Sequence, residues 1–230
     1  MHRASLIALT FLAATVTPAI GAAHVSIASG PAFADTSQEV TFSVGHGCEG
    51  ADTFRVDVEI PSGVTSVRPE TSDFGDVNVQ TDDAGSIVMV SWEKPEAKIL
   101  ATDTQFYKLL VRLKAPAAPF TTLHFPAHQS CKAADGTVTV VDWVGLDEAD
   151  PDVEPAPALY LLPRRYPGWN KFAVPTRVDD LAGFFPDAQI VWLDSAAFSS
   201  NPTTVELIGQ TEGVSLLGAI PGGSEIWVRY

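Results

Sequence analysis

The stretch FRVDVEI, residues 54–60, alternates strictly between apolar and charged side chains. The apolar set is Phe54, Val56, Val58 and Ile60, and the charged set is Arg55, Asp57 and Glu59. Successive side chains of a β-strand point to opposite faces, so this period of two predicts a strand with one buried and one wet face. Strands of this kind fold into a sheet whose apolar face must be covered by another layer.

Similar runs recur from His24 to about Trp143: EVTFSV, SIVMVSW, KLLVRLKAP, TLHFPA and TVTVVDWV. In the first of them Val40, Phe42 and Val44 share one side. Turn signals such as IPSGV and DDAGS separate the runs, and no sustained helical period occurs there. The expected fold class is therefore mainly β, an immunoglobulin/cupredoxin-like antiparallel β-sandwich over residues 24–150.

The chain changes character after this region. GLDEADPDVEPAPALYLLP is acidic and proline-rich, which indicates a linker or an extended crossing segment. RVDDLAGFF predicts a short helix that begins near Asp179, while AQIVWLD and SEIWVRY predict strands. SSNPTTVELIGQ predicts a helix capped by Ser200 or Asn201, with Pro202 in its first turn and Gly209 as its stop.

Residues 151–230 are accordingly expected to form a small α+β unit of unknown role. Trp169, Trp192 and Trp227 are expected in its core or in a hydrophobic groove. YPGWNKF, residues 166–172, is the segment of this unit that most resembles a recognition element.

The first residues have the pattern of a signal peptide. Arg3 precedes the apolar run ASLIALTFLAATV, Pro18 breaks it, and Gly21 and Ala23 supply the small residues that signal peptidase requires. Residues 1–23 are the expected signal peptide, which makes His24 the first residue after cleavage. Cleavage after Gly21 also satisfies the rule and would leave two alanines before His24.

No second apolar run approaches the roughly 20 residues of a membrane-spanning helix. We therefore expect a soluble exported protein, periplasmic or extracellular, without a membrane anchor. The formal net charge of −14 argues against nucleic acid and anionic membranes as partners.

The chain has two cysteines, Cys48 and Cys131. Cysteines of an exported protein mostly pair, and a bridge here would close a loop worth about 4 kcal/mol in the chain-entropy model. Thiolate metal ligation is the weaker alternative, because there is no CxxC motif and thiols rarely persist in an oxidising compartment.

A histidine at a free N-terminus has unusual coordination chemistry. Its amine and its imidazole Nδ1 can hold one metal ion in a six-membered chelate, and neutral nitrogen donors suit Cu(II) above other divalent first-row metals. A carboxylate could complete the site and balance charge. The alternative for His24 is an exposed residue at the start of a strand.

Two further segments carry candidate residues. VGHGCEG contains His46 and Glu49 around Cys48, and a bridge would fix this turn and preorganise Glu49. The alternatives are a solvated carboxylate for Glu49 and a turn residue with an unusual backbone angle for His46. HQSCKAADGTVTVVDW ends in Trp143, which is either core or the wall of a metal site.

Together these segments resemble the YcnI-like copper-binding proteins, exported bacterial proteins associated with copper handling. The resemblance covers residues 24–145 and rests on HVSI, GHGCEGADTFRVDVEIPSGVTSVRPE, MVSWE and LHFPAHQSCKAADGTVTVVDW. It implies a β-sandwich with a single-histidine brace for Cu(II). His24 would provide amine and imidazole, Glu49 a carboxylate, Trp143 a wall, and Cys48–Cys131 the disulfide. Apart from the resemblance, His46 is close enough in sequence to Glu49 to join or neighbour the site. The sequence departs from the family at Phe74, where relatives often have tryptophan.

The leading functional hypothesis is an exported metallochaperone or store for copper, not an enzyme. Its expected partners are the copper ion and another exported or membrane copper-handling protein. A copper oxidase or monooxygenase is the second hypothesis, and it needs a further histidine ligand from His46, His124 or His128. A metal-free immunoglobulin-like interaction module is the third. No GxSxG, HExxH or phosphate-loop motif indicates a hydrolase.

Overall fold

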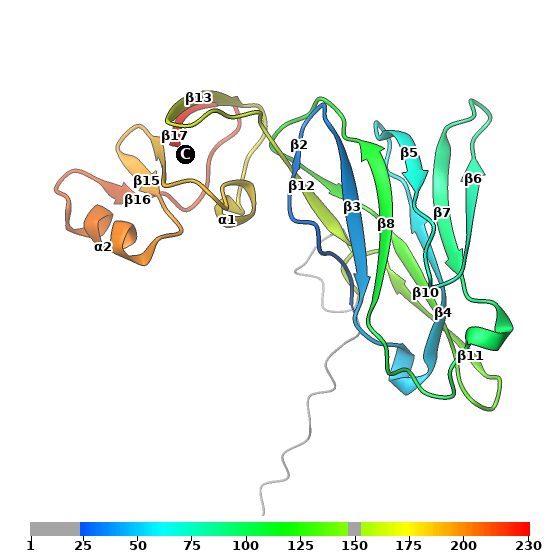
Figure 1. The fold of residues 1–230 in the computed structure, drawn as a ribbon. Helices are drawn as coiled ribbons and strands as arrows, with labels where there is room; N and C mark the ends of the chain where they lie inside the picture. The colour runs from blue at the N-terminus through cyan, green and yellow to red at the C-terminus, as the bar shows by residue number, and fades with distance from the viewer. Residues whose placement is uncertain (1–23, 147–152) are drawn as a thin grey trace, which may run out of the picture.

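The computed structural model describes residues 24–146 and 153–230, so the predicted signal peptide lies outside the described residues. The chain forms a β-sandwich, drawn in blue to green in Figure 1, and a smaller unit drawn in yellow to red. Each unit has its own cluster of buried apolar side chains. Among these residues no helix combines the length and apolarity needed to cross a bilayer.

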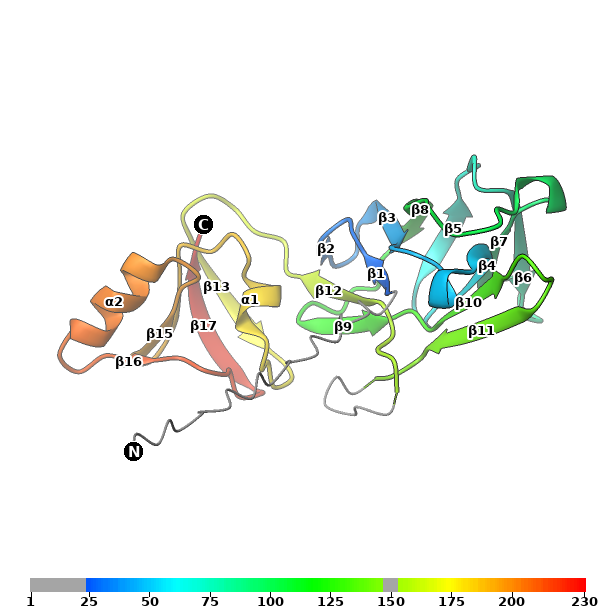
Figure 2. The same ribbon diagram turned by 90° about the horizontal axis from the view of Figure 1, so that it is seen from below.

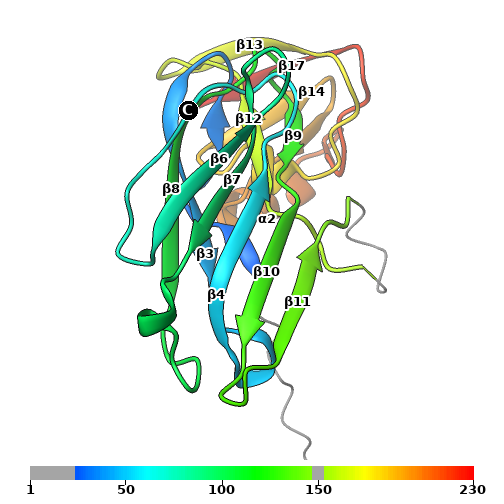
Figure 3. The same cartoon turned by 90° about the vertical axis from the view of Figure 1, so that its right-hand side faces the viewer.

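Two antiparallel sheets form the sandwich, and Figure 3 shows the larger one face-on. The first has the order β1 (Val25–Ile27), β3 (Ser37–Val44), β8 (Tyr107–Lys114), β5 (Thr65–Pro69). The second has the order β11 (Val138–Trp143), β10 (Ala127–Lys132), β4 (Asp52–Glu59), β7 (Ile87–Glu93), β6 (Asp76–Thr81). The short 3₁₀ turns η1 (Cys48–Gly50) and η2 (Glu96–Lys98) precede β4 and follow β7.

The core between these sheets confirms the alternation seen in the sequence. Val40, Phe42 and Val44 of β3 are fully buried, and so are Val56 and Val58 of β4. The rings of Phe42 and Trp92 meet across the two sheets, with centroids 6.5 Å apart. The predicted antiparallel sandwich is confirmed.

A third, three-stranded sheet lies beside β1, at the side of the sandwich that faces the smaller unit (Figure 2). β12 (Ala158–Leu162) pairs in parallel with β2 (Ala32–Phe33) and antiparallel with β9 (Thr121–His124). Leu159 and Leu161 of β12 are buried in the sandwich core. Part of the segment predicted as a linker or crossing segment is thus a strand of the sandwich unit, and it lies beyond residue 150.

The smaller unit is α+β, as predicted. Its sheet has the order β13 (Trp169–Val174), β17 (Ser224–Arg229), β14 (Ile190–Leu193), β15 (Ala196–Phe198), β16 (Ser215–Leu216). The helices α1 (Leu181–Phe184) and α2 (Pro202–Gln210) accompany it, as Figure 2 shows from below. Its core contains Phe185, Val191, Ile226 and Val228, all fully buried.

Helix α2 differs from its prediction at one end. Asn201 is the N-cap, and its side chain accepts a hydrogen bond from the backbone N–H of Thr203 at 2.9 Å. The prediction that Gly209 ends the helix is wrong, because α2 continues to Gln210 and is capped by Thr211 in an extended conformation. The Thr211 hydroxyl donates to the Leu207 carbonyl at 2.7 Å, which satisfies a terminal carbonyl without a left-handed glycine.

Two of the three tryptophans of this unit are not in its core. Trp169 is 51% exposed and Trp227 is 50% exposed, so of the two predicted places, the core or a hydrophobic groove, the core is excluded for both. Trp227 lies between the buried residues Ile226 and Val228 on β17 and therefore points to the opposite face of the sheet. Trp192 is half-buried.

Candidate metal centre

The turn between β3 and β4 is built tightly around Gly47. A Cβ at Gly47 would lie 1.7 Å from the Ala51 carbonyl oxygen, so no larger residue fits there. The following Glu49 has the left-handed backbone angles φ 50° and ψ 31°, which are uncommon for a residue with a side chain. Such backbone strain persists only where surrounding structure fixes it, and it concentrates at functional sites.

A disulfide holds the backbone of this turn in place. Cys48 and Cys131 are bonded, as predicted, and their Cα atoms lie 5.8 Å apart. Cys48 begins the 3₁₀ turn η1 and Cys131 lies in β10, so the bridge ties the turn that carries Glu49 to the second sheet. Both cysteines are buried, which protects the bridge from reductants.

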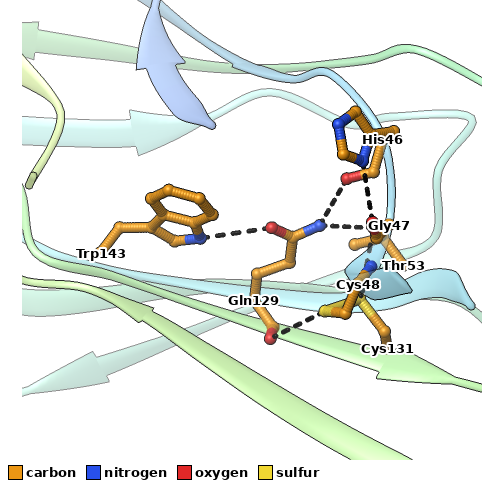
Figure 4. Close-up of a disulfide and its surroundings, with 7 residues drawn as sticks. All are labelled: His46, Gly47, Cys48, Thr53, Gln129, Cys131 and Trp143. Carbon is orange, nitrogen blue, oxygen red and sulfur yellow. Dashed lines mark hydrogen bonds between the residues drawn. A yellow bond between two sulfur atoms is a disulfide. The ribbon is translucent and has the colours of Figure 1, made fainter. Parts of the chain in front are cut away.

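Gln129 connects this turn to Trp143 and was not predicted. Its side-chain amide donates to the His46 carbonyl at 2.9 Å and to the Thr53 hydroxyl at 2.8 Å. Its side-chain oxygen accepts from Trp143 Nε1 at 3.2 Å, and Figure 4 shows the chain of contacts. Gln129 is fully buried and every polar atom of its amide group has a partner, so it holds the turn and the indole in register. The sequence feature that could have indicated this role is the position of Gln129, a polar residue two positions before Cys131 on the same strand.

His24 and Trp143 are brought together. The His24 imidazole and the Trp143 indole have ring centroids 5.2 Å apart at an interplanar angle of 54°. Trp143 is buried, whereas His24 is exposed at the start of β1. Val25 pairs with Val44 at the end of β3, so His24 lies at the same end of the sandwich as the turn with Glu49.

Glu49 offers a carboxylate at this end. Its side chain is exposed, and within residues 24–146 and 153–230 no hydrogen bond or ion pair engages it. No group of three or more His, Cys, Asp or Glu side chains in these described ranges is arranged to hold a metal ion.

His46 lies on the turn with an exposed side chain. Its Nδ1 is 2.9 Å from the Gly47 carbonyl oxygen. Because a carbonyl only accepts, Nδ1 carries the proton in this contact, which directs the lone pair of a neutral ring to Nε2.

His124 and His128 belong to other parts of the molecule. His128 lies between two carboxylates, with Nδ1 at 2.6 Å from Asp142 and Nε2 at 3.3 Å from Glu59. Burial tends to lower its pKa, but the hydrogen bonds to Asp142 and Glu59 outweigh this and raise it. His124 lines a pocket of about 510 Å³ beside the smaller unit, with Phe120 and Tyr160. Neither ring belongs to the site formed by His24 and Trp143.

A buried ion pair follows the turn and was also not predicted. Lys94 Nζ donates to both carboxylate oxygens of Asp52 at 2.7 Å and to the Tyr107 hydroxyl at 2.7 Å. The backbone N–H of Leu100 donates to Asp52, and that of Asp103 donates to the Gly50 carbonyl. Burial, followed by the hydrogen bond to Asp52, raises the pKa of Tyr107. The network fixes Gly50 and Asp52, the residues at the end of the turn.

The sequence matches the family described as a domain of unknown function, DUF1775, over residues 24–161. The chain belongs to the DUF1775 family. This is the domain of the YcnI-like proteins, so the resemblance found in the sequence is confirmed for the family itself. Copper binding and the roles of His24 and Glu49 as ligands stay predictions, and so does the division at residue 150.

One solved structure supports an immunoglobulin-like fold for this DUF1775 domain. An uncharacterized protein from Nocardia farcinica with an immunoglobulin-like fold is 30% identical, with a TM-score of 0.50 over 60% of this chain and 97% of that one. The major pilin subunit of Bacillus cereus is 11% identical, with a TM-score of 0.36 over 89% of this chain and 54% of that one. A DUF4466 protein from Parabacteroides merdae is 13% identical, with a TM-score of 0.24 over 81% and 66%. No curated protein matches.

Proposed function

We propose that this DUF1775 protein is an exported Cu(II)-binding protein that acts in copper trafficking or storage. The observation that supports it most is the contact of the exposed His24 imidazole with the buried Trp143 indole, centroid to centroid at 5.2 Å. A histidine held against an indole at the start of the first strand has one side shielded from water and the other open to a ligand.

The donor set suits Cu(II) as cargo. His24 would provide its imidazole and, after cleavage behind Ala23, its amine, while Glu49 would provide a carboxylate. Neutral nitrogen donors favour copper among the divalent first-row metals, and one carboxylate balances part of its charge. Only this maturation step turns the amide nitrogen of His24 into an amine. Export and formation of the site are therefore one event in this proposal.

The Cys48–Cys131 disulfide supports export, since such bonds persist in oxidising compartments. A site with one histidine ligand favours binding and transfer over oxygen chemistry, which usually needs a second histidine. His124 and His128 lie elsewhere, which leaves His46 as the candidate for that role and makes an oxidase the weaker alternative.

The test is isothermal titration of Cu(II) into protein that begins at His24, compared with matched variants. His24→Ala should abolish tight binding, and Glu49→Gln should weaken it about tenfold or more, the usual scale for losing a metal-site group. Glu70→Gln removes another exposed carboxylate, just after β5 at the opposite edge of the sheet from β1, and should leave the affinity unchanged. Equal affinity for the His24→Ala protein would contradict the proposal and favour a metal-free interaction module.

A further inference from the structure

The outer face of the sheet in the smaller unit carries a cluster of tryptophans. Trp227 of β17 is the cross-strand partner of Trp192 on β14 and of Lys171 on β13. Direct partners share a face, and Trp169 lies two residues before Lys171 on the same strand, so all three indoles lie on one face. We call this set, Trp169, Trp192 and Trp227, the tryptophan face.

The tryptophan face is open at β13 and β17 and covered toward β15, where Ala197, the cross-strand partner of Trp192, is fully buried. The residues that alternate with it, Phe172, Ile226 and Val228, face the core of the unit, where α1 packs. In Figure 1 α1 lies below β13 and β17, on that inner side. Trp169 and Trp227 are each about half exposed, although tryptophan is usually mostly buried. About half of each of these two residues is thus open to solvent and accessible to a partner.

Charged groups surround the indoles in a mixed pattern. Lys171 Nζ pairs with Glu225 at 2.8 Å and lies 5.9 Å from the centre of the Trp227 ring. Arg229 is the cross-strand partner of Trp169. The rim therefore offers both hydrogen-bond donors and an acceptor, which complements neutral hydroxyl groups better than a ligand of one charge.

The size and charge of the face argue against two other partners. A tryptophan has about 250 Å² of surface, so three partly exposed indoles offer about 300–400 Å², well under the roughly 800 Å² per partner of a stable dimer. The acidic chain, with Glu225 on the rim itself, is repelled by anionic bilayers.

We propose that the tryptophan face binds a neutral glycan chain. The apolar C–H faces of pyranose rings can stack on the indoles, while their hydroxyls bond to Lys171, Glu225 and Arg229. Trp169 lies on β13 and Trp227 on the adjacent β17. They are offset by two residues in the pairing register, so their indoles can contact successive sugar rings. None of the proposed copper donors belongs to this unit, so glycan binding and copper binding can each fail without the other.

Affinity electrophoresis of the chain lacking residues 1–23, through gels that contain hydroxyethylcellulose, galactomannan or glycogen, tests this proposal. We expect retarded migration by at least one of these polysaccharides. Trp169→Ala and Trp227→Ala should each weaken the binding about tenfold or more, the loss typical of an aromatic hot spot. Trp227→Phe keeps an aromatic ring that can stack on a sugar, so it should retain part of the glycan binding that Trp227→Ala loses. Leu207→Ala removes a similarly exposed apolar side chain from α2 and should have no effect.

Normal migration of the wild-type chain in all three gels would overturn the proposal. Retardation that survives in the double variant with both alanines would do so as well. Sedimentation would detect the other partners: a concentration-dependent dimer lost in Trp227→Ala would assign the face to a second copy, and co-sedimentation with phosphatidylcholine vesicles would assign it to lipid. Unchanged far-UV circular dichroism and unfolding midpoints in Leu207→Ala and Trp227→Phe establish that these comparisons concern folded protein.

Discussion

The indole of Trp143 donates its ring hydrogen to the side-chain oxygen of Gln129, at 3.2 Å, deep in the sandwich. Through the amide nitrogen of the same Gln129, the indole is connected to the His46 carbonyl and so to the turn that presents Glu49. One buried amide thus sets the relative position of two elements that lie far apart in sequence. The proposed copper site depends on this position.

Gln129→Leu tests this connection. It keeps the volume but leaves the Trp143 N–H, the His46 carbonyl and the Thr53 hydroxyl without their partner. We expect the free energy of unfolding to fall by about 2–3 kcal/mol, the cost of leaving buried polar groups unsatisfied. Urea unfolding followed by tryptophan fluorescence measures it. Gln210→Leu on the exposed surface of α2 is the matched control, and equal effects of both changes would contradict the assignment.

Removal of the disulfide should destabilise the sandwich. In the chain-entropy model, a bridge over 83 positions contributes about 4 kcal/mol, so Cys48→Ala with Cys131→Ala should lower the free energy of unfolding by that order. Guanidinium unfolding of the wild type and of the double variant measures the difference. A reductant should shift the wild-type midpoint toward that of the variant and leave the variant unchanged. The same midpoint for both proteins without reductant would refute a stabilising role.

Loss of one charge of the buried Lys94–Asp52 ion pair should destabilise the protein more than loss of both charges. Lys94→Met leaves Asp52 as a buried charge without its partner and should cost about 3–5 kcal/mol. Lys94→Met combined with Asp52→Asn removes both charges and should be less damaging than the single change. Thermal unfolding compares these proteins with Lys98→Met, an exposed lysine only four residues away that should have little effect. A double variant no more stable than Lys94→Met would show that the pair is not coupled.

His128 should make stability depend on pH. Its pKa is raised in the folded state, because its hydrogen bonds to Asp142 and Glu59 favour the charged imidazole. A group with a raised folded pKa stabilises fully below its unfolded value, near 6.5, and loses this contribution as pH rises through the folded value. Wild-type protein should therefore exceed His128→Gln in stability by at most about 1 kcal/mol at low pH, given the partly exposed partners.

Urea unfolding between pH 5 and pH 9 follows this difference. Asp142→Asn should reduce it, since that carboxylate makes the shorter of the two contacts. A difference that grows with pH would have the wrong sign for this account.

The alternation of apolar residues was enough to predict the sandwich, because Val56 and Val58 face the core whatever their partners are. The disulfide followed from two cysteines and an expected compartment. Gln129 and the Lys94–Asp52 pair could not be predicted, since their energies depend on partners brought together from separate strands. Trp227 was expected in the core or in a hydrophobic groove, although its position between Ile226 and Val228 indicated the face opposite the core.

The most direct test of the central claim is the Cu(II) affinity of two proteins that differ by one residue at the N-terminus. One begins at His24, and the other has a single alanine before it, which converts the His24 amine into an amide. The account predicts that the alanine weakens Cu(II) binding by about 100-fold or more, since the chelate is lost. It also predicts a change in the electron paramagnetic resonance spectrum. Equal affinities and identical spectra would contradict it.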